Sequence, residues 1–253
     1  TFDIHGGGMD LVFPHHEAEI AQSNACNNCN PVNYWMHNNM ITIDGKKMGK
    51  SLGNFINLEE FFNGTHDKLE REYSPMTIRF FILQAHYRST LDFSNEALKA
   101  ADKGFTKLMN AMEALQNLKA SENSTYDVNE LEKKCYSAMD DDFNTPVLIA
   151  HLFDGVRIIN SVKDGKENLN ATDLEKLKTL FNIFFTDILG FISPKESGGN
   201  DLTSEVMELV LKLRGNAKKN EDFDTADLIR DELNKSGIQI KDSREGSSWE
   251  VKN

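Results

Sequence analysis

The sequence has no apolar run that approaches eighteen residues, so we expect no helix that spans a membrane. It has only three cysteines, an odd number that argues against a disulfide framework and for a reducing compartment, which we take to be the cytoplasm. It has no excess of basic residues, and the net charge of −12 excludes a general nucleic-acid-binding surface. It opens with Thr1-Phe-Asp-Ile, which is neither an initiator Met nor the start of a signal peptide. We therefore expect it to be part of a longer protein.

The 253 residues, of which 39% are hydrophobic and 27% charged, are enough for two or three globular domains. Short apolar runs separated by turn signals mark residues 1–60, whereas apolar residues in 61–192 recur every three or four positions, as in amphipathic helices. The polar stretch 194–202 has the composition of a linker, and 203–253 has the pattern of a small terminal module. The fold class that this layout predicts is mainly α with a partial α/β segment.

Local signals define individual elements. The glycines at 6–8 predict a sharp turn after a strand at 2–4, and Pro14 predicts the start of a helix at about 15–25. The other expected elements are strands at 32–36 and 40–43, a hairpin turn at Asp44-Gly45, a helix through Leu98 to Leu115, a helix after Asn144, a helix with a Thr172–Glu175 capping box that Gly190 closes, helices at 203–219 and 223–235, and strands at 237–241 and 249–251.

The segment at 47–54, Lys-Met-Gly-Lys-Ser-Leu-Gly-Asn, contains two lysines together with two glycines and a serine. When ATP activates a substrate, negative charge builds on the departing pyrophosphate, and Lys47 and Lys50 can stabilise that charge more in the transition state than in the ground state. Gly49 and Gly53 give this lysine loop freedom to close. A short lysine loop is less specific than a Walker A motif, and the alternative is a solvated surface turn.

His15 and Glu19 stand four residues apart, a spacing that puts both side chains on one face of a helix. Imidazole and carboxylate suit Zn²⁺, although zinc needs further ligands and the alternative is a surface His–Glu pair. His16 and Glu17 point elsewhere on such a helix and are poorer candidates. The Cys26–Cys29 pair has zinc-ligand spacing, but about 16 Å of helix separates it from His15, so an incidental pair of loop cysteines is the competing interpretation.

A glycine-rich turn after a strand lets a ligand approach the backbone closely, as at the switch points of open α/β sheets. The segment from His5 to Asp10 has this form. Asp10 can accept hydrogen bonds from a ribose, and His5 can meet a carboxylate or a phosphate. The alternative is a structural turn in which Asp10 serves as a cap.

The motifs together resemble cysteinyl-tRNA synthetase, a class I aminoacyl-tRNA synthetase. The segment His-Gly-Gly-Gly-Met-Asp-Leu-Val-Phe-Pro-His-His-Glu-Ala-Glu-Ile-Ala-Gln at 5–22 carries the most specific part of the resemblance. The resemblance continues through Asn33–His37, Lys47–Asn54, Ile78–Leu83, His86–Ser89, Met139–Pro146 and Asp224–Arg230, and so covers nearly the whole chain.

The resemblance implies that cysteine reacts with ATP, supplied with Mg²⁺, to give cysteinyl-adenylate, and that the cysteinyl group then passes to tRNA(Cys). It also implies a zinc ion that binds the substrate thiolate and so selects cysteine over serine. We expect a monomer with no membrane partner. The implied site residues are Lys47 and Lys50 as catalytic residues; His5, Gly7, Asp10, Lys50 and Ser51 for substrate and ATP; and His15 and Glu19 as two of four zinc ligands, the other two being cysteines outside this chain.

The resemblance also assigns domains, namely the C-terminal part of a catalytic nucleotide-binding domain (1–60), a helical stem region (61–120), a helical anticodon-side domain (121–192) and a small α+β module (203–253). The chain departs from the family pattern in two respects. Gly49 stands where the family loop has Ser, and no His-x-Gly-His sequence occurs. Because that first ATP motif and half of the nucleotide fold are absent, we expect this polypeptide to be inactive alone.

Two alternatives remain at this level. The cysteine ligase of mycothiol synthesis uses the same activation chemistry, although its sugar-amine acceptor requires no long helical tail. The second alternative is that the chain is a non-catalytic RNA-binding module, without a role in activation.

Overall fold

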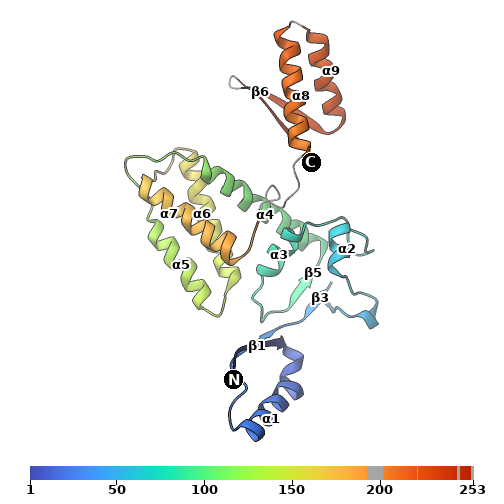
Figure 1. The fold of residues 1–253 in the computed structure, drawn as a ribbon, viewed down its shortest axis with the longest axis vertical. Helices are drawn as coiled ribbons and strands as arrows, with labels where there is room; N and C mark the ends of the chain where they lie inside the picture. Colours follow the sequence, from blue (N-terminus) through green and yellow to red (C-terminus); the bar gives the residue numbers. More distant parts are fainter. Residues whose placement is uncertain (193–201, 221, 244–245, 252–253) are drawn as a thin grey trace. The chain divides into compact units, whose positions relative to one another are not determined.

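The computed structural model describes residues 1–192, 202–220, 222–243 and 246–251 (Figure 1). The chain divides into two compact units, 1–192 and 193–253. The first unit contains β1 (Phe2–Gly8), η1 (Met9–Leu11), η2 (Val12–His16), α1 (Glu17–Asn27), β2 (Val32–Asn38), β3 (Ile41–Ile43), β4 (Lys46–Lys47), η3 (Lys50–Leu52), α2 (Leu58–Asn63), α3 (Pro75–Leu83), β5 (Leu91–Phe93), α4 (Asn95–Gln116), α5 (Val128–Asp140), α6 (Thr145–Lys163), α7 (Ala171–Phe181) and η4 (Asn182–Ile188).

The N-terminal layer is a β–α–β unit in which β1 and β2 pair in parallel and α1 makes the crossover. Parallel strands are normally covered on both faces, and a two-stranded sheet is not stable by itself. Here Phe2, Ile4 and Tyr34 are 71%, 59% and 70% exposed. The β1–β2 pair therefore leaves large apolar side chains of both strands exposed.

A second small sheet carries the lysine loop. β3 lies between β4, which is antiparallel to it, and β5, which is parallel to it. The turn between β3 and β4 has φ values of 52° at Asp44 and 73° at Gly45, which confirms the predicted hairpin turn. The carboxylate of Asp92 in β5 accepts hydrogen bonds from the hydroxyl of Thr42 and the N–H of Gly45, so this hairpin is fixed to the neighbouring strand.

Helices α4 to α7 pack with α3 and η4 around one hydrophobic core. The predicted helix through Leu98 to Leu115 is confirmed as the central part of α4, and both of these residues are fully buried. Each of the four long helices starts at a side chain that accepts a backbone N–H, as N-caps do; these caps are Ser94, Asp127, Asn144 and Asn170. The same core includes Ile43 of β3 and Phe93 of β5, so it fixes the helices relative to the small sheet.

Some element boundaries differ from the sequence-based prediction. Gly6, Gly7 and Gly8 do not form a turn, because they end strand β1, paired with 36–38 of β2. The chain turns only afterwards, at η1. The first α-helix begins at Glu17 and directly continues η2, so the predicted start at about 15 agrees with the structure within two residues; the extended backbone at Phe13, which precedes a proline, interrupts the helical geometry only before that point.

The predicted cap of α7 is also wrong. Asn170, not Thr172, caps this helix by accepting the N–H of Asp173. Asn170 is itself held in place because its N–H donates to the hydroxyl of Ser124. The predicted closure at Gly190 agrees with the structure, since Gly190 has a φ of 65° directly after η4.

The second unit contains α8 (Leu202–Lys219), α9 (Phe223–Lys235), β6 (Ile238–Ser243) and β7 (Gly246–Val251). β6 and β7 pair antiparallel, with Ile238 opposite Val251, so the expected strand pair is confirmed. The predicted linker at 194–202 lies, except for its last residue, outside the described residues. None of the described helices combines the length and the apolar character needed to cross a membrane.

Candidate active site

The glycines at the end of β1 allow a close approach of side chains rather than a turn. A Cβ atom added to Gly7 would lie 2.7 Å from Cε1 of His16, and one added to Gly8 would collide with the carboxylate of Asp10. Neither glycine has a positive φ. The glycine segment therefore leaves space beside β1 for Asp10, which follows it in η1, and for His16, which follows it in η2.

His16, which is buried, lies at the centre of a cluster of rings over β1 and β2. A hydrogen bond of 2.8 Å joins its Nδ1 to Nε2 of His37, and the ring centroids of His5 and Trp35 lie 4.9 and 4.8 Å from its own. Burial, and then the charges that the neighbouring histidines would carry, lower the pKa of His37 from its ordinary value. A neutral imidazole in this cluster can accept a hydrogen bond or ligate a metal.

Three side chains in the N-terminal layer offer metal-ligand atoms that lie within 4.8 Å of one another: His5, His16 and Glu19. Nε2 of His5 is 3.7 Å from Oε2 of Glu19. Two imidazoles and a carboxylate are a donor set that suits Zn²⁺, so the residues present fit such an ion. His15, the predicted partner of Glu19, is exposed and does not belong to this group.

The lysine loop is folded back on itself. Its apex is the single turn η3, and Nζ of Lys50 lies 5.3 Å from the centre of the Phe55 ring, a cation–π contact. At the base of the loop the side chain of Asn54 is buried and bonds to backbone atoms of the loop. Lys47, Lys50 and Ser51 are all exposed and free to meet a ligand.

One cleft brings the glycine segment and the lysine loop together. It has a volume of about 260 Å³ and is lined by Gly8 and Asp10, by Lys47 and Met48, and by residues 38–41. His5, Gly7, Lys50 and Ser51 do not line it. Two of the predicted site residues, Asp10 and Lys47, are thus brought together although 37 positions separate them.

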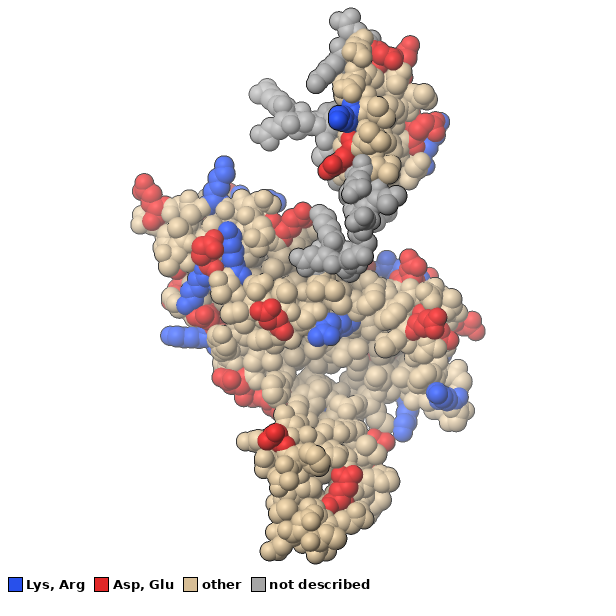
Figure 2. Space-filling model, viewed as in Figure 1, with Lys and Arg blue, Asp and Glu red and all other residues tan. Residues whose placement is uncertain are grey.

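The charges around this cleft are unequal. Residues 1–38 contain four acidic side chains and no Lys or Arg, and the N-terminal layer in Figure 2 accordingly shows red but no blue atoms. A polyphosphate in the cleft would therefore find its cations on the lysine loop. Because Lys46 and Lys47 form β4 and Lys50 begins η3, all three are presented by the hairpin that Asp92 holds.

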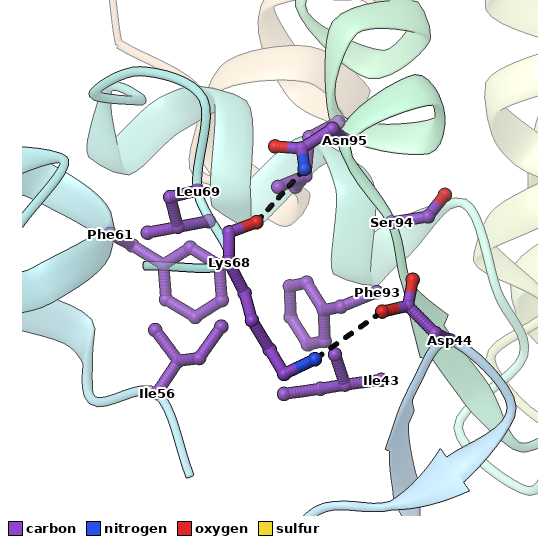
Figure 3. Close-up of a pocket in the computed structure, with 10 residues that line it drawn as sticks. Ile43, Asp44, Ile56, Phe61, Lys68, Leu69, Phe93, Ser94 and Asn95 are labelled. Carbon is purple, nitrogen blue, oxygen red and sulfur yellow. Dashed lines mark hydrogen bonds and ion pairs between the residues drawn. The ribbon is translucent and has the colours of Figure 1, made fainter. Parts of the chain in front are cut away.

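A second hollow lies beside the small sheet, where Lys68 is one of its lining residues (Figure 3). Its volume of about 10 Å³ has room for a single water, so it is a packing defect and not a ligand site. The stem of Lys68 crosses the apolar side chains of Phe61 and Ile43, and its Nζ lies 3.6 Å from Asp44 (Figure 3). Nδ2 of Asn95 donates to the carbonyl of Lys68, which ties this segment to the start of α4.

Cys26 and Cys29 are both exposed. Neither belongs to the group of metal-ligand atoms found among the described residues, which favours the interpretation as incidental loop cysteines. Sequence reasoning missed the roles of His37 and Trp35 in the ring cluster and of Asn54 in the loop. A parallel pairing of β1 with β2 would have placed His37 beside the glycine segment, since Gly7 and His37 are register partners.

Comparison with known proteins identifies the class. Residues 1–103 match the family described as the catalytic domain of class I (C) tRNA synthetases, and residues 134–193 match the DALR domain. Among solved structures, the ternary complex of Agrobacterium radiobacter K84 agnB2 LeuRS with tRNA and LeuAMS has a TM-score of 0.50. At 16% identity over 76% of this chain and 27% of that chain, this likeness concerns the fold alone. The chain is thus a class I synthetase segment followed by a DALR domain.

Closer relatives specify the family. The chain is 56% identical to the cysteine–tRNA ligase of Parabacteroides distasonis and 54% identical to that of Porphyromonas gingivalis, in each case over 99% of this chain and 51% of the relative. The ligase of Chlorobium luteolum is 46% identical over 98% of this chain and 51% of its own. The chain therefore belongs to the cysteinyl-tRNA synthetase family, and it spans about half the length of these relatives.

Proposed function

We propose that this chain forms part of an enzyme that activates cysteine with ATP and transfers the cysteinyl group to tRNA(Cys). The observation that carries the proposal is the cleft between the glycine segment and the lysine loop. An open cleft lined by a carboxylate, Asp10, and a lysine, Lys47, suits a nucleoside triphosphate, whose ribose hydroxyls donate hydrogen bonds and whose phosphates require cations. The matches to cysteine–tRNA ligases support cysteine as the second substrate.

In this proposal Asp10 accepts hydrogen bonds from the ribose, and Lys47 contacts the phosphates. Lys50 leaves the ring of Phe55 and reaches the β- and γ-phosphates, together with the hydroxyl of Ser51. ATP binds together with Mg²⁺. As the adenylate forms, the positive charges of the two lysines stabilise the departing pyrophosphate. The backbone of the glycine segment, Gly7 included, allows the nucleotide to approach β1 closely.

We further propose that His15 and Glu19 hold a zinc ion, which when bound supplies a Lewis acid for the thiolate of cysteine. Both side chains are exposed, so ligands from further polypeptide can reach them. His16 is buried and already bonded to His37, which suits a role in fixing the pocket. His5 then meets the carboxylate of the bound amino acid beside the ring cluster.

The helices beyond residue 120, which include the DALR domain match, are the proposed tRNA-binding part of the chain. The acidic net charge restricts this contact to local basic faces. The boundaries at 60, 120 and 192 between catalytic, stem and anticodon-side regions are part of this proposal, as is the role of 203–253 as a terminal module.

The decisive experiment is a chimera in which residues 1–253 replace the matching segment of the Parabacteroides distasonis ligase, so that the relative supplies the half that this chain does not cover. We expect the chimera to charge tRNA(Cys) with cysteine and to leave a glucosamine-inositol acceptor unchanged. Transfer to the sugar amine would instead favour the mycothiol-pathway ligase. A folded chimera that binds tRNA without activating cysteine would favour the RNA-binding module. Lys50→Ala should slow adenylate formation far more than it weakens tRNA binding, and equal losses would contradict the role of Lys50.

The zinc assignment has a matched pair of variants in adjacent residues. His15→Ala in the chimera should lower the zinc content measured by metal analysis, whereas His16→Ala should retain zinc and lose stability. The reverse result would assign the ion to the group of His5, His16 and Glu19.

A further inference from the structure

The side chain of Asn54 closes the base of the lysine loop. The N–H of Gly49 donates to Oδ1 of Asn54 over 3.0 Å, and Nδ2 of Asn54 donates to the carbonyl of Lys47 over 3.0 Å. The Asn54 amide thus accepts one hydrogen bond from, and donates another to, the backbone at the start of the same loop. Asn54 is only 9% exposed, so water competes poorly for these two bonds.

The apex of the loop is held differently. Its backbone bonds are those of a single turn, from Leu52 to Gly49 and from Gly53 to Lys50, at 3.0 and 3.2 Å. All four of the apex residues 50–53 are exposed. The loop therefore has a fixed base and an apex able to move as one piece, with Gly53, whose φ is 66°, at the junction.

We propose that Asn54 is a positioning residue that keeps the lysine loop in one shape, so that Lys47 and Lys50 are presented together to the phosphates of ATP. This rests on the proposed function of the loop. Without the amide, the loop would lose conformational freedom only as the transition state forms. This entropy cost would lower the rate of activation more than it lowers the affinity for ATP. If the two hydrogen bonds contribute about 1–2 kcal/mol in total, their loss corresponds to a fall of about 5- to 30-fold.

The chain provides a matched control. Asn95 makes the same double bridge elsewhere, since its Oδ1 accepts the N–H of Glu70 and its Nδ2 donates to the carbonyl of Lys68 (Figure 3). Asn95→Ala removes an equivalent amide bridge without touching the lysine loop. Asn54→Asp keeps the acceptor for Gly49 and removes the donor to Lys47, and it should fall between the wild type and Asn54→Ala.

Two measurements test the proposal. In the 253-residue chain, trypsin should cut after Lys47 and Lys50 about 5- to 30-fold faster in Asn54→Ala than in the wild type or Asn95→Ala, at unchanged far-UV circular dichroism. In the chimera, Asn54→Ala should lower kcat for cysteine-dependent pyrophosphate exchange by a similar factor, with KM for ATP within about twofold. Equal cleavage in Asn54→Ala and Asn95→Ala, or a loss confined to KM, would overturn the proposal. If the wild-type chimera shows no exchange, the proposed function fails, whereas the trypsin result still decides whether Asn54 holds the loop.

Discussion

The three glycines at the end of β1 permit a graded prediction, because their surroundings differ while their backbone does not require glycine. A Cβ on Gly6 would meet nothing closer than the carbonyl of Met36 at 3.7 Å, an ordinary contact. A Cβ on Gly7 would lie 2.7 Å from Cε1 of the buried His16, about 0.7 Å inside the 3.4 Å limit of ordinary contact. A Cβ on Gly8 would meet only the exposed carboxylate of Asp10, which can rotate away.

The expected energies follow from these contacts. Gly7→Ala forces the ring of His16 from its site, which costs about 1–3 kcal/mol for overpacking and about 1 kcal/mol for the hydrogen bond to His37. Replacing a glycine in the unfolded chain returns about 0.4–1 kcal/mol. We therefore expect Gly7→Ala to lower the free energy of unfolding by about 2 kcal/mol, whereas Gly6→Ala should be neutral or slightly stabilising and Gly8→Ala should change it by less than about 1 kcal/mol.

Urea unfolding followed by tryptophan fluorescence measures this series. Trp35 lies 4.8 Å from the rings of both His5 and His16, and Trp249, in the other unit, can be replaced by Phe so that Trp35 alone reports. If Gly7→Ala were as stable as Gly6→Ala, the close packing of His16 against β1 would be refuted. A large loss in Gly6→Ala would show that the glycines are needed for backbone conformation after all.

Two further predictions concern single side chains. The pKa of His37 is lowered from 6.5 in the folded chain, so the unfolded chain binds this proton more readily, and the free energy of unfolding should fall as the pH drops below about 6.5. The urea midpoint should therefore fall less steeply between pH 7.5 and pH 5 in His37→Gln than in the wild type. Identical slopes in the two proteins would contradict the lowered pKa. Burial raises the pKa of the Cys135 thiol to about 12, so a thiol reagent at pH 8 should modify Cys26 and Cys29 rapidly and Cys135 only after unfolding. Three equally fast thiols in the native chain would show that Cys135 is accessible.

The sequence was sufficient to predict elements whose signal is local. The apolar period of α4, the Asp44-Gly45 turn and the strand pair of the second unit all follow from neighbouring residues, and the structure confirms them. The cap of α7 was missed although Asn170 is a good N-cap. The bond from its backbone to Ser124, 46 positions away, which fixes it there, is a tertiary contact that no local pattern contains.

The site was predictable in its motifs but not in its geometry. The glycine segment and the lysine loop were recognisable, yet their meeting in one cleft depends on the paired strands between them. His15 and His16 stand four and three residues before Glu19, and both spacings put the side chains on one helix face, so helical spacing could not tell which histidine lies nearer Glu19. Asn54 was present in the motif, but its two hydrogen bonds, to the backbone of Lys47 and of Gly49, form only in the folded loop.

We propose that the glycine segment and the lysine loop belong to one site at which ATP activates cysteine. The most direct test is cysteine-dependent exchange of pyrophosphate into ATP by the chimera with the Parabacteroides distasonis ligase. We expect exchange that requires cysteine and that is abolished when Lys47 and Lys50 are both replaced by Ala. Exchange that persists in a folded chimera without either lysine would contradict it.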